Sequence, residues 1–346
     1  PLFSLLPSVN IFPMGSSTST NRLRTANSTK RPTSETRKIL VLGCMGAGKT
    51  TLCRMLAKTA KARMPPNRIY KHTIENNLLD IFKAIYTLAR QYKIPGSENF
   101  KEDMRILVEF RHREDLAQRA VEVMRRLLRT NLFAELMKDK RRILELPYNA
   151  PYFMQNALRI LDEKFEPNDV DIISHYALTV GVNFNSIELG AVKWELFELP
   201  GHHIFRRCWH EYYANTNVII FVVDLSDICR SAFYRGGHLQ DKVRQILLKV
   251  TMSPLLHQTS FILLFNKKDL LEEIGQGFNF QQLGAGVKNV EAAEKWHTDQ
   301  CISAVPPTNA VYNHSMSLTK KSDMNSTLFD FLDQIFQSGV RSVDLE

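Results

Sequence analysis

One motif constrains the fold of this chain more than any other, the stretch "GCMGAGKT" from Gly43 to Thr50. It matches the P-loop pattern G-x-x-x-x-G-K-[ST], in which the backbone N–H groups of a glycine-rich loop surround the phosphates of a nucleotide. The short apolar run "KILVLG" precedes the motif, and the helical pattern "TTLCRMLAKTA" follows it. Such a loop lies between a buried strand and a helix whose N-terminal end faces the phosphates. The sequence therefore predicts an α/β domain that binds a nucleoside triphosphate.

The residue types within this motif suggest separate roles. Lys49 is expected to reach the β- and γ-phosphates, and the hydroxyl of Thr50 is expected to ligate Mg²⁺. The remaining predicted nucleotide contacts come from the loop and the first helical turn, namely Gly43, Gly46, Ala47, Gly48 and Thr51. The expected ligands of this part of the chain are therefore a nucleotide and Mg²⁺.

A second motif indicates which base the nucleotide carries. The run "FILLFNKKDL" places N-K-x-D, at Asn266, Lys267 and Asp269, directly after another buried strand. A carboxylate there can accept hydrogen bonds from N1–H and the exocyclic amine of guanine, and the lysine stem can lie across the purine face. These residues could also form an ordinary polar turn, but their order after a P-loop favours GTP over ATP. A P-loop kinase that uses ATP would need a different base site.

Two kinds of hydrophobic pattern divide the rest of the chain. Helical spacing prevails from 61 to 171, as in "TIENNLLDIFKAIYTLA" and "APYFMQNALRILDEKF". After it, "VNFNSIEL" and "VKWELFEL" indicate a hairpin, "VIIFVVDL" and "FILLFN" indicate buried parallel strands, and "NAVYNHS" indicates a weaker strand. A closing helix is expected over 326–339. Strands that alternate with helices predict a sheet into which the helical block is inserted.

These patterns give an expected domain organisation. Residues 1–36 are expected to form a flexible basic tail. An α/β domain is predicted over 37–60 and 172–346, with an all-helical domain inserted at 61–171. The longest apolar runs are too short to span a bilayer. The five cysteines are scattered without a C-x-x-C, which favours reduced thiols in a cytosolic setting.

The charge near the N-terminus favours a membrane surface as a partner, and we expect no nucleic acid to bind. The net charge is +9, but no nucleic-acid-binding motif accompanies it, and residues 15–38 hold six basic side chains and one acidic side chain. The stretch "MGSSTS" fits the N-myristoylation pattern with Gly15 as acceptor, if Met14 is the true start. A lipid chain and a basic tail together can hold a protein peripherally at an anionic membrane. A disordered Ser/Thr-rich tail is the alternative.

Together these features resemble the G-protein alpha subunit family, from about Lys38 to Gly339. The helical block lies between the P-loop helix and the first switch, where the family has its helical domain. The stretch "WELFELPGHHIFRRCWHEYYANTNVIIFVVDLSD" resembles the family's second switch with its flanking strands. The resemblance implies a Ras-like GTPase domain with a mostly parallel six-stranded sheet, an inserted all-helical domain, and GTP or GDP with Mg²⁺. It also implies signalling at the cytoplasmic face of the plasma membrane.

Both switches keep some of the family's ligand positions. By resemblance, Thr179 in "YALTVG" is the Mg²⁺ ligand of the first switch, and "ELPGH" stands where the family has D-V-G-G-Q. Glu198 then replaces the Asp that holds Mg²⁺ through water, and Gly201 keeps the N–H that meets the γ-phosphate. The resemblance also places Ser317, in "HSMSL", beside the guanine ring in place of the family's T-C-A loop.

The positions that carry hydrolysis in the family are altered. Tyr176 stands where the family has the arginine that stabilises transition-state charge, and Gly46 stands where it has the Glu that pairs with that arginine. His202 takes the place of the Gln that orients the attacking water, and its imidazole is a weak substitute. Because such an arginine is worth about 10³–10⁵ in turnover, we expect a GTPase that binds well and hydrolyses slowly. The alternative is a non-cycling pseudo-GTPase that serves as a binding or scaffold module.

Partners follow only in part from the resemblance. It implies a G-protein-coupled receptor and a downstream effector as possible partners. The family's long N-terminal helix lies on the βγ dimer, but its counterpart over 15–37 is short, Ser/Thr-rich and broken by Pro32, so binding of βγ stays open. The tail "GVRSVDLE" keeps little of the family's receptor-binding end. A zinc site at the histidines of "PGHH" is disfavoured, because no Cys or carboxylate falls at ligand spacing.

Overall fold

The computed structural model describes residues 36–62, 65–109, 118–189, 192–233, 239–283 and 286–319. The basic tail with Gly15 and the helix expected over 326–339 lie outside the described residues. Within these ranges, no helix is both long enough and apolar enough to span a bilayer.

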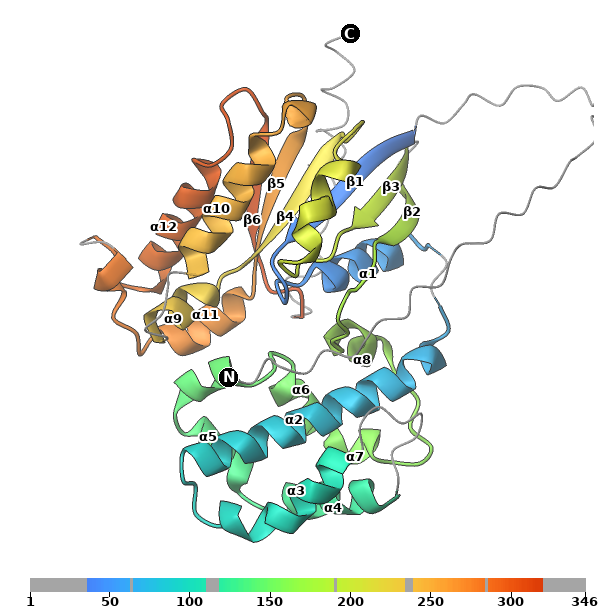
Figure 1. Cartoon of the computed structure of the whole chain (residues 1–346), viewed down its shortest axis with the longest axis vertical. Helices are drawn as coiled ribbons and strands as arrows, with labels where there is room; N and C mark the ends of the chain where they lie inside the picture. Colours follow the sequence, from blue (N-terminus) through green and yellow to red (C-terminus); the bar gives the residue numbers. More distant parts are fainter. Residues whose placement is uncertain are drawn as a thin grey trace, which may run out of the picture. The chain divides into compact units, whose positions relative to one another are not determined.

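Six strands form one sheet in the order β2-β3-β1-β4-β5-β6 (Figure 1). All neighbours are parallel except β2 and β3, which form the antiparallel hairpin. This confirms the mostly parallel six-stranded sheet that the resemblance implies. The strands are β1 (Thr36–Gly43), β2 (Asn183–Leu189), β3 (Val192–Glu198), β4 (Val218–Asp224), β5 (Ser260–Asn266) and β6 (Val311–Ser315).

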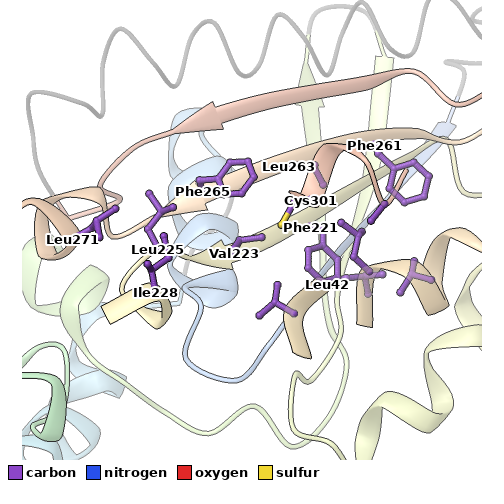
Figure 2. Close-up of a cluster of buried hydrophobic side chains, with 14 of the residues drawn as sticks. Leu42, Phe221, Val223, Leu225, Ile228, Phe261, Leu263, Phe265, Leu271 and Cys301 are labelled. Atoms are coloured by element: carbon purple, nitrogen blue, oxygen red, sulfur yellow. The ribbon is translucent and has the colours of Figure 1, made fainter. Parts of the chain in front are cut away.

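The inner strands β4 and β5 are buried along their whole length, and they are apolar at every position except their ends. One face packs against α10 and α12, and Figure 2 shows Phe221, Val223 and Phe265 of this cluster beside Cys301 of α12. The other face packs against α1 through residues such as Leu52. The helices flanking the sheet are α1 (Lys49–Thr59), α9 (Asp227–Phe233), α10 (Leu239–Thr251), α11 (Lys268–Gly275) and α12 (Val290–Ile302), with short 3₁₀ turns at Phe205–Tyr212, Pro254–Leu256 and Phe280–Leu283.

Every regular element among the described residues between α1 and β2 is a helix. The expected apolar face of α2 is buried in a core of its own, formed by Ile74, Leu78, Ile81, Phe82 and Ile85 with residues of the following helices. The elements are η1 (Asn67–Tyr70), α2 (Lys71–Gln91), η2 (Ser97–Phe100), α3 (Lys101–Glu109), α4 (Gln118–Leu128), α5 (Leu132–Met137), η3 (Lys140–Glu145), α6 (Ala150–Gln155), α7 (Ala157–Ile160) and α8 (Asp169–Ser174).

Three details of this block differ from what its helical spacing predicts. The pattern over 150–165 forms two short helices, α6 and α7, which are separated at Asn156, where the backbone N–H and the side-chain amide both donate to the carbonyl of Tyr152. The domain boundary predicted after residue 171 falls inside α8. The segment η3 also leaves the helical core, since Ile143 and Leu144 are buried in the cluster of the sheet.

Candidate functional site

The carboxyl ends of three adjacent parallel strands bring the predicted site residues together. β1 ends at Gly43 in the P-loop, β4 ends at Asp224, and β5 ends at Asn266. Asp224 and Asn266 are opposite each other in the register of β4 and β5. Since parallel strands end at the same edge of a sheet, loops that are far apart in the sequence meet there. The P-loop and the N-K-x-D motif are therefore neighbours.

Close contacts and left-handed backbone conformations explain the outer glycines of the P-loop. Gly43 has φ +139°, and a Cβ there would lie 2.3 Å from the carbonyl oxygen of Val222. Gly48 has φ +107°, and a Cβ there would lie 2.3 Å from Nδ2 of Asn266. Larger residues are strained in these left-handed conformations and would also clash. Gly46 has φ +80° but faces open space, so only its backbone conformation favours glycine.

Lys49 lies inside the loop. Its side chain is buried, and Nζ donates to the carbonyl oxygen of Cys44 at 2.9 Å. Burial lowers the pKa of Lys49, and the negative charge of Glu198 opposes that shift. A buried ammonium at a helix N-terminus gains from an anion beside it, which the phosphates of a nucleotide would supply. Thr51, also predicted as a contact, donates its hydroxyl to the Ile173 carbonyl of α8 at 3.4 Å.

Asn266 joins the predicted base-binding residues to the P-loop. Its amide nitrogen donates to the carbonyl of Ala47 at 2.9 Å, and its Oδ1 accepts from the backbone N–H of Leu318 at 3.1 Å. This buried side chain at the end of β5 thus makes hydrogen bonds with the P-loop and with the turn after β6. It fixes these two segments relative to β5.

The other base-site residues are also held by polar contacts. Ser317 Oγ donates to Oδ1 of Asp269 at 2.6 Å and accepts from the Asp269 N–H at 2.9 Å, which orients the carboxylate. Lys267 is buried and forms an ion pair with Asp224. The motifs did not identify Asp224, although its place at the end of a buried strand is a signal that could have found it.

Tyr148, between η3 and α6, is a second residue that the sequence analysis missed. Its phenol donates toward the carboxylate of Asp269, and its ring faces the ammonium of Lys267. No motif or spacing marks this residue, because it reaches the site from the helical block through tertiary packing alone.

The three residues predicted to hold Mg²⁺ converge. The hydroxyl of Thr50 donates to Oε1 of Glu198 and lies 3.2 Å from the hydroxyl of Thr179, which is itself 3.3 Å from the same carboxylate oxygen. Asn183, at the start of β2, donates to Oε2 of Glu198 at 2.9 Å. Two hydroxyls and one carboxylate form an oxygen ligand set of the kind that Mg²⁺ takes, so the residues present fit this ion. Across the described parts of the chain, no group of three or more His, Cys, Asp or Glu could hold a metal.

Gly201 of the second switch lies against the P-loop, in addition to the contact between Glu198 and Thr50. A Cβ added to Gly201 would lie 2.5 Å from the Gly43 carbonyl oxygen and 2.5 Å from Nζ of Lys49, so only glycine fits there. The next residue, His202, is half-buried, and its ring centroid lies 4.3 Å from that of His203. The structure therefore brings Gly201 against the P-loop, and it pairs the ring of His202 with its neighbour.

The first switch is attached to the helical block at Tyr176. Asn77 of α2 accepts from the Tyr176 N–H at 2.5 Å and donates to its carbonyl at 2.7 Å. The Tyr176 side chain is 48% exposed. Its neighbour His175 is buried, with Nδ1 2.7 Å from the Ile172 carbonyl and Nε2 3.0 Å from a guanidinium nitrogen of Arg54.

The chain is similar to a set of known proteins over nearly its whole length. A family model described as the G-protein alpha subunit matches residues 15–335. The guanine nucleotide-binding protein alpha-14 subunit of Caenorhabditis elegans is 23% identical, over 89% of this chain and 82% of that protein. The alpha-2 subunit of Neurospora crassa is 22% identical, over 89% of this chain and 90% of that protein. The alpha-2 subunit of C. elegans is 24% identical, over 70% and 71%.

Proposed function

The chain belongs to the G-protein alpha subunit family, and we propose that this guanine-nucleotide-binding signal transducer is a switch that binds GTP and hydrolyses it slowly. Members of the family are GTPases. The observation that carries the proposal is the hydrogen-bonded position of Asn266, which joins the P-loop to the base-binding turns. A nucleotide needs both parts at a fixed distance, because its phosphates and its base are held at the same time.

The base and phosphates would be held by different charges. Asp269, oriented by Ser317, would accept from the N1–H and amine of guanine. Lys49 would neutralise the phosphates, and its lowered pKa would return toward the ordinary range once an anion lay beside it. Mg²⁺, held by Thr50 and Thr179 and through water by Glu198, would supply positive charge to the phosphate oxygens.

The proposed switch depends on two contacts with the P-loop. Thr179 lies beside Thr50, and Gly201 lies against the backbone of Gly43. In GTPases, contacts to the γ-phosphate order such segments and its loss releases them. We place the nucleotide-dependent change in these two segments.

Slow hydrolysis is proposed from the side chains at the two catalytic positions. Tyr176 carries no positive charge, so it cannot replace an arginine that is worth about 10³–10⁵ in turnover. The half-buried imidazole of His202 would have to orient the attacking water in place of a Gln amide. Binding needs neither side chain, so tight binding with slow turnover is the expected combination.

The remaining assignments concern the cellular setting. Proteins of this family generally lie peripherally at the cytoplasmic face of a membrane, and we propose the same place here, with Gly15 as a lipid acceptor if Met14 is the start. A receptor and an effector are proposed as partners on the same basis, and binding of a βγ dimer is left to experiment.

The decisive experiment is single-turnover hydrolysis of bound GTP by the purified chain, with Mg²⁺ and with EDTA, recording the initial occupancy. Stoichiometric binding followed by slow hydrolysis that depends on Mg²⁺ would support the proposal. Binding without any hydrolysis would overturn the GTPase part and leave a GTP-locked module. If GTP failed to bind, the proposed function would be wrong.

A further inference from the structure

Tyr148 makes contacts in the base site that neither the motifs nor the family resemblance explain. Its phenol oxygen lies 3.3 Å from Oδ1 and 3.2 Å from Oδ2 of Asp269, so its single proton is shared between both carboxylate oxygens. The same phenol oxygen lies 3.1 Å from the hydroxyl of Thr319. Burial and the charge of Asp269 raise the pKa of Tyr148 well above its ordinary value, so the phenol keeps its proton as a donor.

The ring of Tyr148 makes a second contact of a different kind. Nζ of Lys267 lies 4.7 Å from the ring centroid, within the range of a cation–π interaction. Lys267 is held in place by its ion pair with Asp224. The ring therefore presents its face to a fixed, buried ammonium.

These two contacts use the same two side chains, Asp269 and Lys267, that a guanine base is predicted to use. Guanine offers N–H donors to the carboxylate of Asp269 and a flat π face to the side chain of Lys267. Tyr148 offers an O–H donor to the same carboxylate and a flat π face to the same lysine. Since its proton is directed at both carboxylate oxygens, the phenol occupies the edge of Asp269 that a guanine needs.

We propose that Tyr148 is an internal competitor for the base site, which guanine must displace from Asp269 and Lys267 before it can bind. This inference rests on the proposed function, since it takes the site to be one for guanine nucleotides. When the competent form of a site is only a fraction of the population, the apparent affinity falls by that fraction. Tyr148 thus sets how tightly and how fast the chain takes up a guanine nucleotide.

The backbone on both sides of Tyr148 is held in place. Before it, Leu144 is buried in the cluster of the sheet, and its carbonyl accepts from the guanidinium of Arg230. After it, the amide of Asn149 donates to the Ser174 carbonyl at 3.0 Å and to the Asn77 side chain at 3.3 Å. With the chain held at both ends, the site opens by rotation of the Tyr148 side chain.

The test replaces one hydroxyl and keeps the ring. Tyr148→Phe should bind GDP about tenfold more tightly than the native chain and associate with it faster, because the competing hydrogen bond to a charged group is gone. Tyr148→Leu, which also removes the π face, should bind GDP at least as tightly as Tyr148→Phe. Tyr152→Phe is a matched control, since Tyr152 also donates from the helical block to a carboxylate, Oδ1 of Asp171 at 2.7 Å, outside the base site. Its GDP affinity should equal that of the native chain.

Calorimetry with GDP and with ADP, and stopped-flow association of GDP, separate the outcomes. Tighter GDP binding by both Tyr148 variants, with ADP still excluded, would support the competitor. If the native chain bound GDP and Tyr148→Phe bound it equally or more weakly, Tyr148 would line the site without competing with guanine. The inference would then be wrong, while the proposed function would stand. If GDP bound to none of these proteins, the proposed function and the inference would both fail.

Discussion

The residues predicted to hold the base, which also contact the P-loop, differ from the switch segments in their burial and hydrogen bonding. We call Asn266, Lys267, Asp269 and Ser317 the base wall, and 176–182 and 199–205 the switch segments. The base wall is mostly buried and bonded to itself and to the P-loop. The first switch segment leaves Tyr176, Leu178 and Val180 about half exposed. The residues predicted to bind the nucleotide are thus mostly buried and hydrogen-bonded, whereas the segment in which we propose that turnover is decided is more exposed.

The largest expected effect tests the buried lysine of the P-loop. Lys49→Ala should lower GTP affinity roughly a thousandfold or more, because it removes a buried cation from the phosphates. The matched control is Lys268→Ala, since Lys268 is a neighbour of the base wall but pairs with Glu294. Equilibrium binding of GTP to the three proteins measures the difference. Equal affinities for Lys49→Ala and the native chain would show that the P-loop does not bind the phosphates.

The next effect tests the switch segments. Tyr176→Arg combined with His202→Gln should raise the single-turnover rate about 10²–10³-fold, because it restores a charge and a water-orienting amide. Nucleotide affinity should stay unchanged, which would show that binding and turnover depend on different residues. His203→Gln is the matched control, since it changes the exposed neighbour of His202. An unchanged rate in the double variant would mean that the switch backbone itself, anchored to Asn77 at Tyr176, holds the wrong geometry.

The two regions also differ in what the sequence could predict. The P-loop and N-K-x-D motifs are local patterns, and their meeting follows from the buried strands that precede them, which end at one edge of a parallel sheet. Tyr148 could not be predicted, because its place depends on how η3 packs against the sheet through Ile143 and Leu144. Likewise, helical periodicity does not reveal the break between α6 and α7 at Asn156.

A third prediction concerns the base wall alone. Asp269→Asn should weaken GTP binding about a hundredfold and shift preference toward xanthine nucleotides, because an amide offers a donor where guanine also presents donors. Hydrolysis of whatever GTP is bound should keep its native rate, since the switch segments are untouched. Competition between GTP and XTP for the site measures the preference. An unchanged preference for GTP would show that Asp269 does not read the base.

The prediction with the smallest expected effect concerns two buried histidines, one beside the base wall and one beside the first switch segment. On the base-wall side, the ring of His297 packs against Phe265 of β5, and within the described residues neither of its ring nitrogens has a hydrogen-bond partner. On the switch side, both ring nitrogens of His175 have neighbours, the Ile172 carbonyl and the guanidinium of Arg54. Burial lowers the pKa of each histidine to about 4, helped at His175 by the charge of Arg54. Equal pKa shifts thus arise from unequal surroundings.

Because both histidines are neutral in the folded chain, the unfolded chain binds more protons between its ordinary histidine pKa of about 6.5 and about 4. The free energy of unfolding should therefore fall as the pH drops through that window, by about 1 kcal/mol per pH unit for each histidine. His297→Leu should remove its share of this slope at little cost at pH 7.5, since it breaks no hydrogen bond. His175→Leu should remove a similar share but cost about 1 kcal/mol at pH 7.5, because it leaves the Ile172 carbonyl and Arg54 without the ring. Urea unfolding from pH 4.5 to 7.5 measures both slopes, and equal costs at pH 7.5 would contradict the distinction between the two surroundings.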